Sequence, residues 1–159
     1  MIVDDEPAVL TLMKDLAEAQ NLEVHSFLDP VKALEALAVH KADFSAILTD
    51  IRMPILDGIE FIQRARQMQF DLPIVVVSGH LDQSLTIDAL KMGAFDFIAK
   101  PFDLDRFENI VQQAVSNGDE IRKLFAEIER QFSKESPDKI ELLKKTRQVL
   151  LNMRKPSGS

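Results

Sequence analysis

Short apolar segments end in polar residues at four points of the chain. In chain order these polar residues are Asp4 with Asp5, Asp50, Ser78 and Lys100. If the apolar segments are parallel strands of one sheet, their carboxyl ends meet at the same edge. Three carboxylates, a hydroxyl and an ammonium group are then expected to converge on one site.

Crowded carboxylates indicate a hard divalent cation at this site, because Asp5 and Asp50 would repel each other at close range without one. Mg²⁺ suits such a site, since it takes oxygen ligands from one or two carboxylates and from phosphate groups. The matching chemistry is phosphoryl transfer. Asp50 would be the nucleophile, while Lys100 and Ser78 would stabilise the charge on the phosphoryl oxygens.

The segments that carry these residues alternate with helix-period segments, which is typical of βα units and a mostly parallel sheet. The unbroken β-branched and apolar run at Ile74–Val77 predicts a strand covered on both faces. The expected strands are 2–3, 22–27, 46–48 (ending at Asp50), 74–77 and 97–99. The expected helices begin at Pro7, at Pro30 behind the N-cap Asp29, after Asp57-Gly58, near Asp82, and behind the N-cap Asp103.

Four motifs stand in a fixed order along the first 117 residues: Ile2–Glu6, Leu48–Pro54 with Asp57-Gly58, Val76–His80, and Gly93–Phe102. Together they resemble the receiver domain of the bacterial two-component response regulators. The resemblance implies an α/β fold, a flavodoxin-like, doubly wound five-stranded parallel sheet of order 2-1-3-4-5. It also implies phosphorylation of Asp50 by a histidine kinase or a phosphotransfer protein.

The same resemblance implies a metal site and a limited chemistry. Mg²⁺ would be held by Asp5, Asp50 and the backbone carbonyl of Arg52, with Asp4 acting through water. The domain is then expected to be a phosphoacceptor signalling domain and not an enzyme, with only self-catalysed phosphotransfer and dephosphorylation.

A switch mechanism is implied as well. Phosphorylation adds negative charge at Asp50, which would draw Ser78 toward the phosphoryl group and let Phe97 turn inward. Phe97 lacks a hydroxyl, so the rearrangement would change protein–protein contacts through packing alone. The resemblance also implies a cis peptide bond between Lys100 and Pro101.

Charge and periodicity change at Asn117-Gly118, a dipeptide typical of turns. Residues 1–117 carry a net charge of −10, and residues 118–159 carry +3. We therefore expect a receiver domain over 1–117 and a two-helix extension over 118–159, with a break at 136–138 and a disordered tail. Helices of about 15 residues are marginal alone, so their apolar faces are expected to dock on the receiver, on each other or on a second chain. A homodimeric or partner-binding helical hairpin over 118–159 is favoured.

Composition excludes several classes of protein. The formal net charge is −7 and no dense basic patch is present, so direct nucleic-acid binding is not expected. No apolar stretch approaches the roughly 20 residues of a membrane span. Cysteine is absent and no signal-peptide pattern is readable, which favours a cytoplasmic protein.

Two alternatives stay open at this point. The first strand, Ile2-Val3, is short, and a weakened acidic pair would leave an unphosphorylated receiver-fold interaction module. A metal-dependent phosphohydrolase with an Asp nucleophile is less favoured, because haloacid-dehalogenase-like enzymes use an Asp-x-Asp pattern. In Asp50-Ile51-Arg52 an arginine stands where the second carboxylate should be.

Overall fold

The computed structural model describes residues 1–40, 43–68, 71–79 and 83–132. Its elements are β1 (Ile2–Val3), α1 (Pro7–Ala19), β2 (Ser26–Phe27), α2 (Pro30–Val39), β3 (Ile47–Asp50), α3 (Gly58–Gln67), β4 (Ile74–Ser78), α4 (Gln83–Lys91), β5 (Asp96–Ala99) and α5 (Leu104–Phe132). All five strands are parallel, in the order β2-β1-β3-β4-β5. The predicted doubly wound sheet is confirmed. Within these ranges, no helix combines the length and hydrophobicity needed to cross a bilayer.

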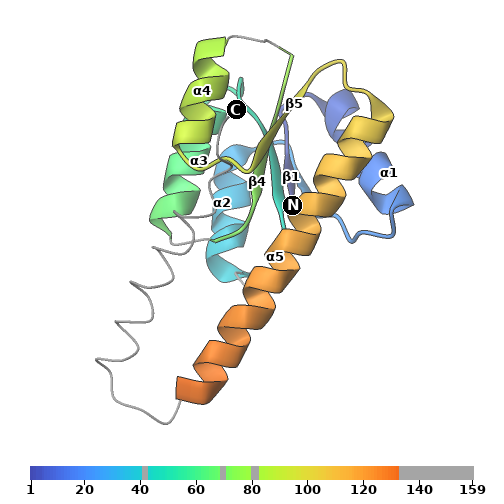
Figure 1. Cartoon of the computed structure of the whole chain (residues 1–159). Coiled ribbons are helices and arrows are strands. Elements are labelled where there is room, and N and C mark those ends of the chain that lie inside the picture. Colours follow the sequence, from blue (N-terminus) through green and yellow to red (C-terminus); the bar gives the residue numbers. More distant parts are fainter. Residues whose placement is uncertain (41–42, 69–70, 80–82, 133–159) are drawn as a thin grey trace.

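Helices cover both faces of the sheet. Successive residues of each strand point to opposite sides, so the strands contribute apolar side chains to both faces. One apolar cluster joins the sheet to α2, α3 and α4, and a second joins its other face to α1 and α5 (Figure 1). The first cluster takes from the strands Val3, Ile47, Ile74 and Val76, and the second takes Ile2, Leu48, Val75, Val77 and Ile98. Burial on both faces explains the nearly continuous apolar strands and fixes their carboxyl ends along one edge.

Side-chain caps explain where three of the helices begin. The carboxylates of Asp29, Asp57 and Asp103 each accept a hydrogen bond from a backbone N–H two or three residues further on, at 2.8–2.9 Å. The strand predicted at 22–27 is shorter in the structure, where only Ser26–Phe27 pairs with β1. Its length follows from its neighbour, since β1 itself has two residues.

The turn predicted at Asn117-Gly118 is wrong, because α5 runs unbroken from Leu104 to Phe132. A Cβ on Gly118 would lie 1.7 Å from the carbonyl oxygen of Ser45, so this glycine allows a close approach between α5 and the segment before β3. Arg122, one turn further on, donates a hydrogen bond to Ser45 Oγ at 2.9 Å. The first helix of the predicted extension is therefore, as far as Phe132, the second half of α5.

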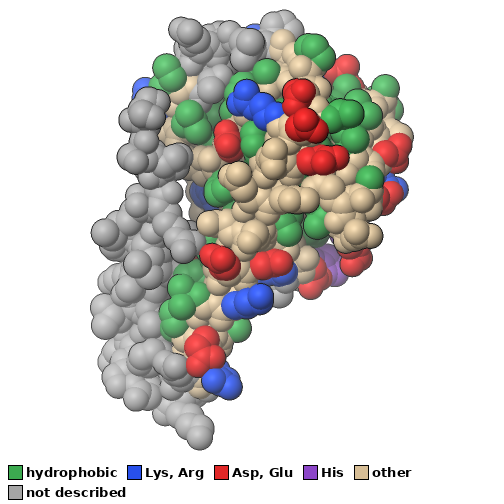
Figure 2. All heavy atoms as spheres, turned by 45° about the vertical axis from the view of Figure 1, so that its right-hand side comes forward, with side chains coloured by type: hydrophobic (Ala, Val, Ile, Leu, Met, Phe, Trp, Pro, Cys, Tyr) green, Lys and Arg blue, Asp and Glu red, His purple; other side chains and the backbone are tan. Residues whose placement is uncertain are grey.

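The second half of α5 is amphipathic, and Figure 2 shows acidic and basic side chains along it next to hydrophobic ones. The second helix of the predicted extension, its break at 136–138 and its tail lie outside the described residues. The division into domains at 117–118 stays a prediction.

Gly118→Ala is expected to destabilise the protein by about 2 kcal/mol, although alanine normally favours a helix over glycine by about 1 kcal/mol. The new Cβ would clash with backbone atoms of Ser45. A side-chain rotation cannot move backbone atoms out of the way, so α5 has to shift. Urea denaturation measures the change. Ser116→Ala, at an exposed position of the same helix, is the control and should change stability by only a few tenths of a kcal/mol. A Gly118→Ala protein more stable than its parent would contradict this close contact.

Candidate functional site

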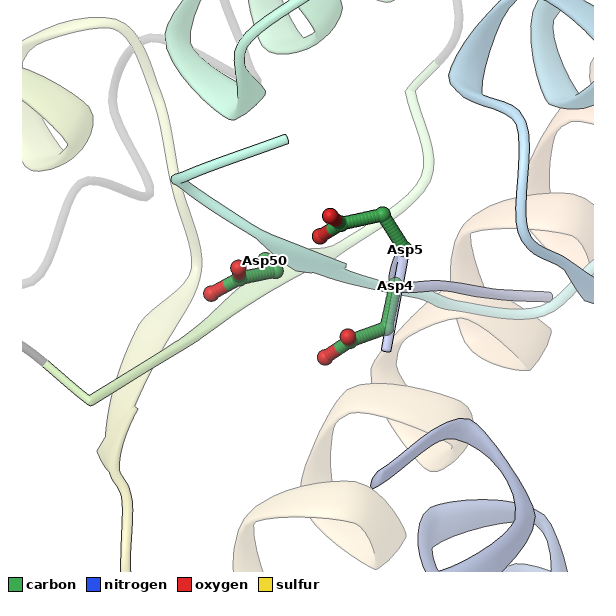
Figure 3. Close-up of side chains that lie close together, drawn as sticks. All are labelled: Asp4, Asp5 and Asp50. Carbon is green, nitrogen blue, oxygen red and sulfur yellow. The ribbon is translucent and has the colours of Figure 1, made fainter. Parts of the chain in front are cut away.

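Three carboxylates lie together at the carboxyl edge of the sheet. Asp4 and Asp5 follow β1, and Asp50 is the last residue of β3. Each contributes one oxygen to a group whose members all lie within 4.8 Å of one another. Figure 3 shows the three side chains pointing in the same direction. The side chain of Asp4 is fully buried, Asp50 is nearly so, and Asp5 is half-buried.

Lys100 supplies the positive charge of this cluster from the end of β5. Its Nζ lies 2.7 Å from Asp4 Oδ2, 3.6 Å from Asp50 Oδ1 and 3.7 Å from Glu6 Oε1. Burial lowers the pKa of Lys100, but the hydrogen bond to Asp4 and the charges of Asp50, Asp4 and Glu6 outweigh burial and raise it. Lys100 is therefore an ammonium ion at neutral pH.

The groups around the carboxyl group of Asp50 shift its pKa in opposite directions. Its burial raises the pKa of Asp50, the charge of Lys100 lowers it, and the charge of Asp4 raises it again. The backbone N–H groups of Ile51 and Arg52 donate to the carboxylate and lower the pKa, but the net shift is upward. Without a further cation, the ionised form of Asp50 is therefore less favourable here than in water.

Two of the other predicted site residues, Ser78 and Phe97, lie on β4 and β5. Ser78 ends β4 and is buried, and its carbonyl accepts a hydrogen bond from the N–H of Lys100 at 2.8 Å. Phe97 lies on β5, half-buried against the apolar cluster under α2, α3 and α4. Arg52 is exposed and lies two residues after Asp50, in the loop that follows β3. The peptide bond between Lys100 and Pro101 is cis.

The loop after β3 returns to Asp50, a contact that sequence reasoning missed. Gly58 N donates to the carbonyl of Ile51 at 2.8 Å, and a Cβ on Gly58 would lie 2.1 Å from the carbonyl oxygen of Asp50. The Asp57-Gly58 pair predicted only a turn and a helix start. The ion pairs of Lys100 with Asp4 and Glu6 were also missed, because spacing along the chain carries no information about side-chain pairing.

Asp50→Asn is expected to stabilise the metal-free protein at pH 7 by about 0.5–2 kcal/mol, the usual range of a stabilising substitution. Because the pKa of Asp50 is raised, the folded protein binds this proton more tightly than the unfolded chain, and the ionised carboxylate opposes folding above its raised pKa. Asparagine removes that charge. Urea denaturation in a chelator should give the largest difference near neutral pH and a shrinking one as the pH falls toward about 3.9, the ordinary aspartate value. A difference that stays constant over this range would contradict the assignment.

Comparison with known proteins gives a consistent result. Residues 1–112 match the family described as the response regulator receiver domain. Over 122 residues the chain is 34% identical to the transcriptional regulatory protein FixJ of Bradyrhizobium diazoefficiens, covering 77% of this chain and 58% of FixJ. Over 127 residues it is 37% identical to the C4-dicarboxylate transport transcriptional regulatory protein DctD of Rhizobium meliloti, covering 79% of this chain and 26% of DctD. The chain thus spans less than two thirds of the length of FixJ and about a quarter of the length of DctD.

Among solved structures, the fold is similar to the receiver domain of the sensor histidine kinase PA1611 from Pseudomonas aeruginosa PAO1. The match has a TM-score of 0.65 and 25% sequence identity, and it covers 72% of this chain and 94% of that domain. The PA1611 structure has a magnesium ion coordinated in its active-site cleft.

Proposed function

The chain belongs to the response regulator receiver family, and on this premise we propose that it accepts a phosphoryl group on Asp50 from the phosphohistidine of a histidine kinase or a phosphotransfer protein. The observation that carries the proposal is the position of Asp50. Its carboxylate lies at a strand end, grouped with the oxygens of Asp4 and Asp5 and 3.6 Å from the ammonium group of Lys100. Carboxylates with one fixed cation suit phosphoryl transfer.

We include Mg²⁺ in this proposal because the donor set fits it. The grouped ligand atoms are carboxylate oxygens, which a hard divalent cation prefers. Asp5, Asp50 and the backbone carbonyl of Arg52 would hold the ion, and Asp4 would act through water. When bound, Mg²⁺ supplies positive charge next to the phosphoryl oxygens. It would also offset the repulsion among the three carboxylates.

The residues of the chain would perform the transfer as follows. A carboxylate oxygen of Asp50 forms a bond to phosphorus while the P–N bond to the donor imidazole breaks. The imidazole nitrogen keeps the bonding electron pair and takes up a proton from water. Lys100 would hold one phosphoryl oxygen and the Ser78 hydroxyl would donate to another, as groups that act where negative charge is concentrated. The ionised form of Asp50 is required, because the protonated carboxyl group is a much weaker nucleophile than the carboxylate.

The signal would leave the site through packing. Phosphorylation would draw the buried Ser78 toward the phosphoryl group and let the half-buried Phe97 turn inward. Protein contacts would then change, including a homodimer through 118–159, with the domain itself making no contact with nucleic acid. The expected place of action is the cytoplasm, and the expected chemistry is one phosphorylation per chain followed by slow self-hydrolysis.

Intact-mass measurement after incubation with acetyl phosphate and Mg²⁺ tests the proposal. The parent should gain one phosphoryl group, and both an Asp50→Asn variant and the parent in excess EDTA should gain none. A variant that is phosphorylated as fully as the parent would place the site elsewhere. Multiple turnover of phosphate esters would favour a phosphohydrolase, and no mass gain in the parent would favour an unphosphorylated interaction module.

A further inference from the structure

The loop between β3 and α3 contains a residue in a backbone conformation that its side chain disfavours. Ile55 has a φ of 74°, and the N–H of Leu56 donates to the carbonyl of Pro54 across it at 2.8 Å. This is a γ-turn with a left-handed central residue, a rare and strained form. A positive φ is a genuine outlier for a β-branched residue.

The same residue is exposed. Ile55 has 86% of its surface in solvent, the largest fraction among the exposed large apolar residues in the described part of the chain. Met53 and Leu56 on either side are buried and hold the turn in place, so the Ile55 side chain is directed outward. Neither burial nor backbone preference favours isoleucine here, and strained residues of this kind cluster at functional sites.

The loop is tied at both ends to Asp50, which fixes where Ile55 can be. At its start, the N–H of Arg52 donates to the Asp50 carboxylate. At its end, Gly58 packs against the backbone of Asp50 and Ile51. Ile55 is three residues from each of these ties, so its Cα lies within about 11 Å of them, given at most about 3.6 Å per residue.

A protein that delivers a phosphoryl group to Asp50 must cover this region. A standard protein–protein interface buries about 800 Å² on each partner, which corresponds to a circle of about 16 Å radius, larger than the reach of the loop. We propose that Ile55 is an apolar contact residue for the phosphohistidine-bearing protein that phosphorylates Asp50. The inference rests on the proposed function and adds to it a residue that favours a protein donor over a small-molecule donor.

The distinction follows from size. Acetyl phosphate reaches the carboxylate of Asp50 without touching a side chain at the outer tip of the loop. A protein donor places its own surface over that tip, where it would desolvate the Ile55 side chain and gain affinity from the burial of its apolar surface. Removing Ile55 should therefore slow only the protein donor.

The test compares Ile55→Asn, Ile55→Gly and Ile55→Val with the parent. Asparagine and glycine tolerate a positive φ, so both variants are expected to fold at least as well as the parent. The matched control is Val39→Asn, at the end of α2, where the aliphatic side chain is 75% exposed. The protein donor is the purified, autophosphorylated histidine kinase that transfers fastest to the parent in a kinase panel, and the small donor is acetyl phosphate with Mg²⁺.

For the kinase, Ile55→Asn and Ile55→Gly should lower kcat/KM for transfer about 10-fold, while Ile55→Val and Val39→Asn stay within about twofold of the parent. Phosphorylation by acetyl phosphate should stay within about twofold for all four variants. Unchanged kinase transfer in Ile55→Asn, or an equal loss with both donors, would overturn the inference. The inference would also be overturned by a panel in which no kinase phosphorylates the parent faster than acetyl phosphate does.

Two further outcomes separate this inference from its rivals. If light scattering shows that Ile55→Asn lowers the oligomeric state of the parent, the exposed side chain serves a second copy of the chain, and the inference is wrong. A parent that acetyl phosphate does not phosphorylate overturns the proposed function itself. Normal acetyl phosphate chemistry with kinase transfer indifferent to Ile55 overturns only the role of Ile55.

Discussion

Lys100→Met is expected to lower the rate of phosphorylation of Asp50 about 100-fold or more, as removal of one preorganised donor commonly does. It should also destabilise the metal-free protein by about 3 kcal/mol. The Nζ of Lys100 lies 2.7 Å from Asp4 Oδ2, and the two side chains are 13% and 0% exposed. Removing one partner of a buried ion pair leaves an uncompensated charge, which is strongly destabilising.

The second carboxylate strengthens this expectation. Lys100 also lies 3.6 Å from Asp50 Oδ1, and its charge lowers the pKa of Asp50. In Lys100→Met that pKa should rise further, so a smaller fraction of Asp50 is ionised for attack. Raising the pH should therefore recover the part of the lost phosphorylation rate that comes from incomplete ionisation of Asp50. The part that comes from the missing ammonium group should not recover.

Urea denaturation and acetyl phosphate kinetics measure the two effects separately. Lys91→Met is the matched control, because Lys91 is 72% exposed and its partner Asp88 is 3.8 Å away, a surface pair worth little. A double variant with Asp4→Asn and Lys100→Met should regain much of the stability without regaining the phosphorylation rate. If the Lys100→Met single variant is as stable as the parent, the expectation is wrong, because solvent then already stabilises the charge of Asp4.

The convergence of these groups could be predicted from sequence because it depends on few physical facts. The apolar runs Ala46–Leu48 and Ile74–Val77, which lead toward Asp50 and Ser78, predict strands buried on both faces, and such strands require a parallel sheet with helices on each side. Parallel strands place their carboxyl ends at one edge. The register of β3 against β4 in the structure, with Asp50 opposite Val77, agrees with this expectation because it places Asp50 next to the strand end that carries Ser78.

What could not be predicted depends on contacts between distant backbone segments. Glycine has the same local signature in a turn and in a close approach, so Asn117-Gly118 predicted a turn although Gly118 contacts Ser45 inside a continuous helix. The γ-turn at Ile55 could not be predicted either, because a β-branched residue argues against a positive φ. In both cases tertiary constraints outweigh local preference.

Gly58 stands at a helix start that the sequence predicts and also makes a close backbone contact that the sequence does not predict. Gly58→Ala is expected to have the largest effect of any single methyl group added near the site. The new Cβ would lie 2.1 Å from the carbonyl oxygen of Asp50, 2.7 Å from Ile51 Cα and 2.9 Å from the carbonyl carbon of Asp50. All three are backbone atoms, so relief requires moving the end of β3 or the start of α3. We expect a loss of about 3 kcal/mol in stability, at the upper end for overpacking.

Phosphorylation should fall with it, because the displaced backbone carries the Asp50 carboxylate and the N–H groups of Ile51 and Arg52 that donate to it. Acetyl phosphate kinetics at a temperature where the variant stays folded should show a loss of about 10-fold or more, since misplacement by about 1 Å costs as much as 100-fold. Gly79→Ala is the matched control: among the described residues, the one atom near its new Cβ is Lys100 Cβ, at 3.8 Å, which is an ordinary contact. Near-parental kinetics in Gly58→Ala would mean that α3 moves away while Asp50 stays in place. In that case, the loop between β3 and α3 does not position Asp50.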